Sequence, residues 1–322
     1  MEYRKLPHGA EQISVIGLGT SVVGEHSVQN VVETVTFALD SGVNYIDLAG
    51  GHAAIFPGIG EALAGRRKDA YLQLHFGADY TSGEYGWNPT LDGVKRSVAW
   101  QLEQLKTDYI DFGFMHCLDE IGDLEDYERN GILRYLLDLK AQGVVKHIGL
   151  STHVPKLASR VLDMGILDMM MFSINPMYDY GHGDFSIGSA SERYSLYTRC
   201  EKEGVGISVM KPFNAGQLLD AKKSPIRPGA HARAVHPVRA RPPRRPDRHA
   251  GRGQCGGAEA QSVLSRRERA GAGLFRHCLP HAEGHEGYVR VLQALPSLPG
   301  GTGYRPHQQV LRSVPSGRRT RE

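Results

Sequence analysis

The sequence predicts an α/β fold, a (β/α)₈ TIM barrel that is incomplete because only seven strands are recognisable. Up to Pro225, short β-type runs alternate with runs of helical period. Gly, Asn or Asp marks each boundary between them. An open dinucleotide-binding sheet would need G-x-G-x-x-G after the first strand, but the glycines there, Gly17, Gly19 and Gly24, have a different spacing. We therefore favour the barrel.

The predicted strands are seven short apolar runs. They are Ile13–Gly19, Val43–Ala49, Tyr71–Phe76, Tyr109–His116, His147–Ser151, Met169–Asn175 and Val205–Lys211. Apolar residues at helical spacing predict helices between them, most clearly over 28–39 and 94–105. Gly42, Gly143 and Gly204 each separate a predicted helix from the next strand, where a left-handed C-cap favours Gly.

The composition changes near Ser224. The chain has 20 basic and 29 acidic residues up to Pro225, then 18 basic residues, all Arg, and 6 acidic ones. We therefore divide the chain into a barrel over 1–225 and an Arg/Pro/Gly-rich tail over 226–322. We expect the tail to be disordered, because its apolar content cannot offset the entropy of ordering it.

Two interpretations of the tail are open. A basic arm could bind the phosphates of a nucleic acid. Alternatively, the tail is read out of frame. With suitable wobble bases, a shift of one base turns 226–259 into a helix, a strand and a Gly turn. The same shift places four cysteines after Tyr288 at the spacing of a ferredoxin-like [4Fe–4S] ligand set. Because one offset yields two coherent segments, we favour the frameshift and expect no nucleic-acid partner.

The composition also indicates the cellular compartment of the protein. No run approaches the roughly 20 apolar residues of a membrane span, and the first residues lack a signal sequence. Cys117, Cys200, Cys255 and Cys278 lie too far apart for a metal knuckle and suit a reducing compartment. We expect a cytoplasmic protein without a membrane partner.

Polar residues gather where the predicted strands end. They are Asp47, His75, His116, Ser151, Asn175 and Lys211. A single histidine at a strand end is usually a structural residue. Because barrel enzymes place their chemistry at the carboxyl ends of the strands, several such residues on one rim predict a functional site.

Six segments resemble the aldo-keto reductases, NADPH-dependent carbonyl reductases built as (β/α)₈ barrels. They are "SVIGLGTS", "GVNYIDLA", "IGEALAGRR", "LKTDYIDFGFMH", "GVVKHIGLSTH" and "GISVMKPFNAGQLL", which follow the family's order over residues 1–220. "MEYRKLP" is similar to the hairpin that closes the bottom of these barrels. The resemblance implies reduction of a small-molecule carbonyl to an alcohol.

The resemblance implies a catalytic tetrad of Asp, Tyr, Lys and His. Asp47 and His116 match the Asp and the His, whereas His52 stands at the tyrosine position and His75 at the lysine position. An imidazolium with a pKa of ~6.5 can also donate a proton. We therefore expect His52 to be the acid, with weak, acid-favoured reduction or an unusual substrate.

The resemblance also implies cofactor contacts, for NADPH or NADH. They are Gly19, Thr20, Ser151, Thr152, Asn175, Met210, Lys211 and Gly216. Binding should be weak, because the eighth βα unit, which holds the adenosine phosphate in this family, is not recognisable. Some members carry a C-terminal [4Fe–4S] domain, but its ligand cysteines are absent here.

Three other functions stay open beside an impaired reductase. Asp47, His52, His75 and His116 could serve a metal-dependent hydrolase, because His and carboxylate bind Zn²⁺. The chain could be a catalytically silent barrel remnant, or its tail could bind nucleic acid. The expectation of impaired activity and poor solubility rests on the missing strand, because an open barrel exposes unpaired strand edges. The oligomeric state is not predicted.

Overall fold

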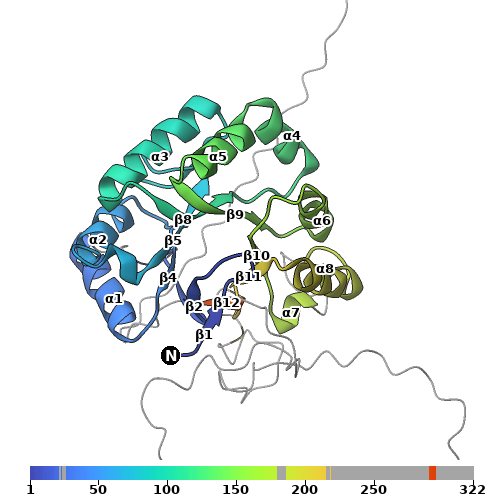
Figure 1. Cartoon of the computed structure of the whole chain (residues 1–322), viewed down its shortest axis with the longest axis horizontal. Helices are drawn as coiled ribbons and strands as arrows, with labels where there is room; N and C mark the ends of the chain where they lie inside the picture. The colour runs from blue at the N-terminus through green and yellow to red at the C-terminus, as the bar shows by residue number, and fades with distance from the viewer. Residues whose placement is uncertain (22, 24–26, 180–185, 215–217, 219–289, 295–322) are drawn as a thin grey trace, which may run out of the picture.

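A ring of eight parallel strands surrounded by helices forms the fold (Figure 1). The computed structural model describes residues 1–21, 23, 27–179, 186–214, 218 and 290–294. The strands follow the order β10-β11-β12-β3-β4-β5-β8-β9 and close into a barrel. Their bounds are β3 Ile16–Gly19, β4 Tyr45–Asp47, β5 Tyr71–Phe76, β8 Ile110–Met115, β9 Val145–Thr152, β10 Met169–Ser173, β11 Gly206–Met210 and β12 Arg290–Ala294. Each of the seven predicted strands overlaps one of these strands.

The predicted TIM-barrel fold and its seven strands are confirmed, and one short strand that was not predicted, β12, pairs between β11 and β3. Arg290 pairs with Ile207 of β11, and Ala294 pairs with Leu18 of β3. The two free edges of a seven-stranded sheet present backbone N–H and C=O groups that an extended segment can satisfy through its main chain. Sequence analysis missed this strand because it lies in a segment without recognisable periodicity. The other residues of the 226–322 tail lie outside the described residues.

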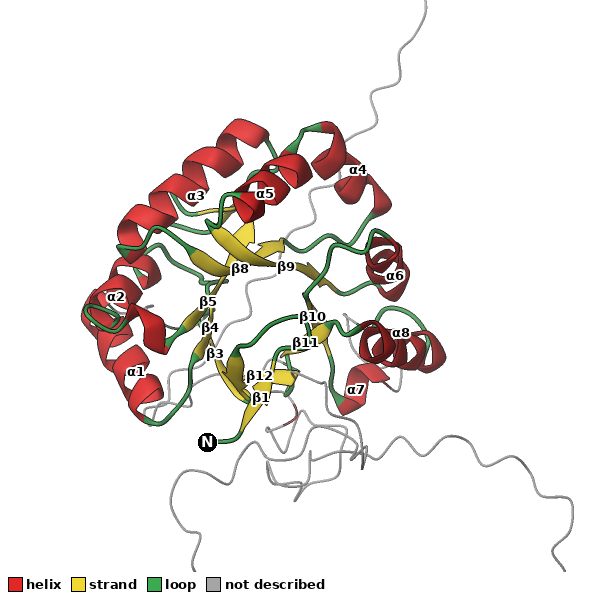
Figure 2. Cartoon of the chain, viewed as in Figure 1, coloured by secondary structure: helices red, strands yellow, loops and turns green. Residues whose placement is uncertain are grey.

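Helices cover the outside of the ring (Figure 2). They are α1 Val28–Asp40, α2 Ile55–Ala62, α3 Leu91–Leu105, α4 Ile121–Arg129, α5 Ile132–Ala141, α6 Pro155–Asp163, α7 Pro176–Asp179 and α8 Ala190–Glu203, with a 3₁₀ turn at Arg67–Asp69. Ser27 and Thr90 cap α1 and α3 with their side chains. The predicted turn glycines Gly42, Gly143 and Gly204 have φ of +86°, +77° and +70°. No helix in the described part of the chain is long and apolar enough to cross a membrane.

An antiparallel hairpin closes one end of the barrel, as predicted. It consists of β1, Tyr3–Lys5, and β2, Gln12–Ser14. Leu6 and Ile13 from this region pack in a buried cluster with Tyr45, Phe112 and Met169 of the ring. Because the hairpin fills this end, the opposite end, at the carboxyl ends of the strands, is left for the site. A second small hairpin, β6 Ala78–Asp79 and β7 Gly86–Trp87, follows β5.

Candidate active site

Three of the four predicted catalytic residues meet at the carboxyl ends of adjacent strands. Asp47 is the last residue of β4, His75 lies in β5, and His116 follows β8. All three are buried. His75 Nε2 lies 2.6 Å from Asp47 Oδ1, and His75 Nδ1 lies 2.9 Å from His116 Nδ1. The carboxylate and the two imidazoles are therefore linked in series.

His52 lies outside this series. Its side chain is 40% exposed, and its Nδ1 is 3.7 Å from a carboxylate oxygen of Glu84. It follows β4 by five residues, in a loop rather than in the ring. Its role as the acid therefore stays a prediction based on the resemblance.

Tyr85 continues the series on the other side of His116. Its hydroxyl is 3.0 Å from His116 Nε2. We call the set Asp47, His75, His116 and Tyr85 the imidazole chain. Sequence analysis missed Tyr85, because it lies next to β7 in the connection between two short strands, where no strand-end pattern applies.

A second missed residue, Gln73, supports the carboxylate. Its Nε2 donates to Asp47 Oδ1 at 2.9 Å, and its Oε1 accepts from the hydroxyl of Tyr45. Gln73 lies two residues before His75 in β5, so both side chains point to the same face of the strand. That spacing was a signal from which Gln73 could have been predicted.

Burial keeps His116 and Tyr85, at one end of the imidazole chain, neutral. It lowers the pKa of His116 well below its ordinary value, and the neighbouring charges of His75 and His153 lower it further. Burial raises the pKa of the Tyr85 phenol to about 12, with a smaller contribution from Cys117. Near neutral pH, Tyr85 is therefore a protonated phenol that contacts the neutral imidazole of His116.

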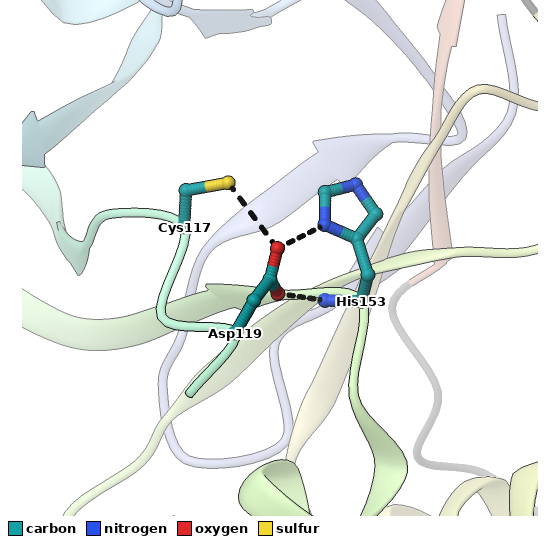
Figure 3. Close-up of side chains that lie close together, drawn as sticks. All are labelled: Cys117, Asp119 and His153. Carbon is teal, nitrogen blue, oxygen red and sulfur yellow. Dashed lines mark hydrogen bonds and ion pairs between the residues drawn. The ribbon is translucent and has the colours of Figure 1, made fainter. Parts of the chain in front are cut away.

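A second cluster lies at the same mouth, after β8 and β9 (Figure 3). Asp119 Oδ2 is 2.8 Å from His153 Nδ1 and 3.8 Å from Cys117 Sγ. The other oxygen of Asp119 accepts from the backbone N–H of His153 at 2.7 Å and from the Thr152 hydroxyl at 3.2 Å. Lys211 Nζ lies 2.7 Å from His153 Nε2. We call Asp119, His153 and Lys211 the lysine chain.

Charge dominates the lysine chain. Burial acts to raise the pKa of Asp119, but the hydrogen bonds from His153 outweigh it and lower that pKa. Burial lowers the pKa of Lys211 to about 8, so its amine is still largely protonated at pH 7. Burial, with Lys211 adding to it, lowers the pKa of His153 despite the hydrogen bond to Asp119. The arrangement is a carboxylate and an ammonium bridged by a neutral imidazole.

The second cluster contains zinc-type ligands. The ligand atoms of Cys117, Asp119 and His153 lie within 4.8 Å of one another, the only such set of three among the described residues. However, the ammonium of Lys211 donates to His153 Nε2, which leaves the ring proton on Nδ1, facing Asp119. A metal ion would need the lone pair of His153 Nδ1, and only the imidazole ring would separate the ion from the Lys211 ammonium. The geometry therefore favours a hydrogen-bonded chain over a metal centre.

The predicted metal ligands do not form such a set. Asp47, His75 and His116 lie in series, so that His75 separates the other two, and His52 pairs with Glu84 instead. The hydrolase alternative thus loses its ligand geometry within the described residues.

The predicted cofactor residues are arranged along one side of the mouth. Gly19 ends β3, and the Thr20 hydroxyl donates to the backbone oxygen of Asp47 at 2.7 Å. Ser151 and Thr152 end β9, and both are buried. Met210 ends β11 and packs in the inner cluster with Met169 and Met171. Gly216 lies outside the described residues.

Asn175 is largely engaged in local structure. Its Oδ1 accepts from the backbone N–H groups of Met177 and Tyr178, and its Nδ2 donates to the backbone oxygen of Lys211 at 2.9 Å. A side-chain amide has two N–H donors, so one remains beyond this bond. Asn175 could therefore offer one donor to a ligand.

Comparisons with known proteins agree on one family. The model described as "Aldo/keto reductase family" matches residues 15–252. The chain is 30% identical over 183 residues to the uncharacterized oxidoreductase YqkF of Bacillus subtilis, which covers 54% of this chain and 57% of that protein. It is 26% identical to L-galactose dehydrogenase of Arabidopsis thaliana, over 68% of each protein. The chain thus spans little more than half of YqkF.

Solved structures agree on the fold. Aldo-keto reductase AKR11C1 of Bacillus halodurans, in its holo form, superposes with a TM-score of 0.56 at 23% identity, over 68% of each chain. An aldo-keto reductase of Pseudomonas aeruginosa gives a TM-score of 0.54 at 22% identity, over 72% of this chain and 82% of that one. These likenesses support the TIM-barrel fold.

Proposed function

Because the chain belongs to the aldo/keto reductase family, we propose that it reduces a carbonyl group of a small molecule to an alcohol with a nicotinamide cofactor. The observation that carries the proposal is the series Asp47–His75–His116 at the carboxyl ends of β4, β5 and β8. A carboxylate behind two imidazoles can hold a proton close to a reacting oxygen. The cofactor supplies the hydride when bound.

Part of the mouth fits the nicotinamide end of such a cofactor. The Ser151 hydroxyl makes no hydrogen bond within the described residues, and Asn175 keeps one N–H donor. Both are uncharged groups suited to a carboxamide. We propose NADPH over NADH, as in the resembling family, and Lys211 as a phosphate contact.

We propose weak cofactor binding. The expectation of impaired activity rested on an open barrel, and β12 removes that reason. What remains is the absence of a recognisable unit for the adenosine phosphate after residue 225. We therefore propose a measurable reductase whose KM for NADPH lies near the upper end of the usual range, about 1 mM.

The proposal is tested by following NADPH or NADH oxidation at 340 nm with a panel of small aldehydes and ketones. Quenching of Trp87 and Trp100 fluorescence reports cofactor binding separately. Ser151→Val should raise the KM for NADPH by about 3- to 10-fold through the loss of one hydrogen bond. Tyr194→Phe, on the exposed face of α8, is the matched control. Wild-type protein that neither quenches nor turns over would contradict the proposal and favour the silent remnant.

We keep the frameshift as a proposal about the gene. The change from mixed Lys and Arg to Arg alone after Pro225 supports it. The pairing of Arg290–Ala294 with β3 and β11 counts against it, because the printed sequence itself offers an eighth strand. Resequencing the DNA across Ser224 decides between the two, and also decides whether intact relatives should carry the iron–sulfur ligands.

A further inference from the structure

We infer that Tyr85 is the residue that protonates the carbonyl oxygen, and that Asp47, His75 and His116 reload it. The inference rests on the proposed function and names its proton donor. An unbroken series of hydrogen bonds supports it: 3.0 Å from Tyr85 to His116, 2.9 Å from His116 to His75, and 2.6 Å from His75 to Asp47. Each distance is short enough for proton transfer between the joined atoms.

Backbone contacts hold Tyr85 over the site. Its N–H lies 3.4 Å from the oxygen of Gly51, and the N–H of Ala53 donates to Gly83 at 3.0 Å. His52 and Glu84 form an antiparallel bridge between the same two segments. The connection between β6 and β7 is thus tied to the loop after β4, which holds the backbone of Tyr85 in place while its hydroxyl contacts His116.

Packing fixes the ring as well. The Tyr80 ring lies 5.9 Å from the Tyr85 ring, and the Trp87 ring lies 5.5 Å from the His116 ring. Tyr85 is nevertheless 38% exposed. The hydroxyl therefore contacts a buried imidazole, while part of the residue is accessible to an approaching molecule.

We assign one neutral state to the imidazole chain from the ionised Asp47 carboxylate, which can only accept hydrogen bonds. His75 donates from Nε2 to the Asp47 carboxylate, so its Nδ1 accepts from His116 Nδ1. His116 Nε2 then accepts from the Tyr85 hydroxyl. In this state the phenol proton points into the protein and cannot reach a substrate.

One added proton reverses the direction of donation. With both nitrogens of His75 protonated, His75 donates from Nε2 to Asp47 and from Nδ1 to His116. His116 then carries its proton on Nε2 and donates to the Tyr85 oxygen. The Tyr85 proton is now free to point toward the mouth. The added charge lies next to the Asp47 carboxylate, 2.6 Å from His75.

The reaction balances in this state. Reduction adds a hydride at the carbonyl carbon, supplied by the nicotinamide cofactor, and a proton at the oxygen from Tyr85. As the Tyr85 O–H bond breaks, His116 passes its Nε2 proton to the phenol oxygen, and His75 passes its Nδ1 proton to His116. The carbonyl is reduced to the alcohol, the cofactor is oxidised, and the imidazole chain returns to its neutral state.

The groups that face the imidazole chain favour its protonated state. Gln73 donates to Asp47, and Tyr45 donates to Gln73. Cys117 and Tyr80 face Tyr85, and His153 lies near enough to oppose a charge on His116. Asp47 is the only carboxylate among these groups, so it is the partner that stabilises the added proton. Reduction consumes one proton and alcohol oxidation releases one, so reduction should slow and oxidation should gain as pH rises.

The test compares Tyr85→Phe with wild-type full-length chain in the 340 nm assay. We expect kcat to fall by about 10²- to 10³-fold with KM within threefold, because the ring stays and only the hydroxyl group is removed. Tyr194→Phe should match the wild type. Tyr85→Phe retaining more than a third of wild-type kcat would overturn the inference while leaving the proposed function intact.

Two further variants separate the roles. His52→Gln tests the competing acid. If kcat falls by about 10²- to 10³-fold in His52→Gln while Tyr85→Phe keeps more than a third of wild-type kcat, the proton donor is His52 instead. His75→Leu tests the reloading step, and its kcat for reduction should be low and no longer fall with rising pH. A wild-type pH dependence kept in His75→Leu would contradict the role of His75. Wild-type protein without any turnover would remove the proposed function and this inference together.

Discussion

Two hydrogen-bonded chains lie at the mouth of one barrel and begin with the same pair. In the imidazole chain, Asp47 binds His75, and in the lysine chain, Asp119 binds His153. The next partner differs. His75 continues to a neutral imidazole and a phenol, whereas His153 meets the ammonium of Lys211. In the imidazole chain, one added proton can reverse the direction of hydrogen-bond donation. In the lysine chain, the ammonium and the carboxylate at its two ends hold the protons in place.

This difference separates catalysis from stability. Moving a proton requires donors and acceptors that can exchange roles, which the imidazole chain has. The lysine chain has a fixed donor, Lys211, and a fixed acceptor, Asp119, and it joins the ends of β8, β9 and β11. We therefore expect variants of the first chain to affect turnover, and variants of the second to affect the free energy of unfolding.

The largest expected effect is that of His116→Phe. It breaks the imidazole chain at its middle, so kcat should fall by about 10²- to 10³-fold. The free energy of unfolding should fall by less than about 2 kcal/mol, because only two neutral hydrogen bonds are lost and Phe can still pack on Trp87. Turnover and urea denaturation measure the two effects. To compare the two, the fall in kcat is converted to a free energy. A loss in the free energy of unfolding that exceeds this value would contradict the division between the imidazole chain and the lysine chain.

Asp119→Asn should show the opposite pattern. The carboxylate accepts from the ring and backbone of His153 and from Thr152, and the amide cannot keep all of these bonds. The free energy of unfolding should fall by about 2–3 kcal/mol in urea denaturation. Asp126→Asn, at an exposed ion pair with Arg129, is the control and should change it by less than about 0.5 kcal/mol. Equal values for the two variants would show that the lysine chain does not stabilise the fold.

The smallest effect concerns pH. Lys211 has its pKa lowered to about 8 in the folded protein, below the ordinary value of 10.5. Between these values the unfolded chain binds more protons, so the free energy of unfolding should rise with pH. The rise should be about 2 kcal/mol, and Lys211→Met should lack it. Denaturation of both proteins at pH 7.5 and pH 10 measures the difference, and identical slopes would mean that Lys211 titrates normally.

Much of the site followed from strand periodicity. Asp47, His75 and His116 were predicted at strand ends, and they lie there in contact, because parallel strands of one barrel bring their carboxyl ends to one rim. His52 was predicted from the family resemblance, because it stands at the position of the family's tyrosine in the segment after Asp47. That segment is a loop, and a loop does not fix where a side chain points, so His52 faces Glu84 instead.

The sequence by itself determined seven strands of the ring and the acidic and imidazole groups at its mouth, and its resemblance to the family indicated the hairpin below the ring. Periodicity and turn residues act locally, and each of these features depends on a short stretch of chain. Only the tertiary structure decided that β12 closes the ring, that Tyr85 reaches His116 and that Lys211 meets His153. The physical reason is that these contacts join segments far apart in the chain, whose meeting depends on backbone pairing and packing that no local pattern records.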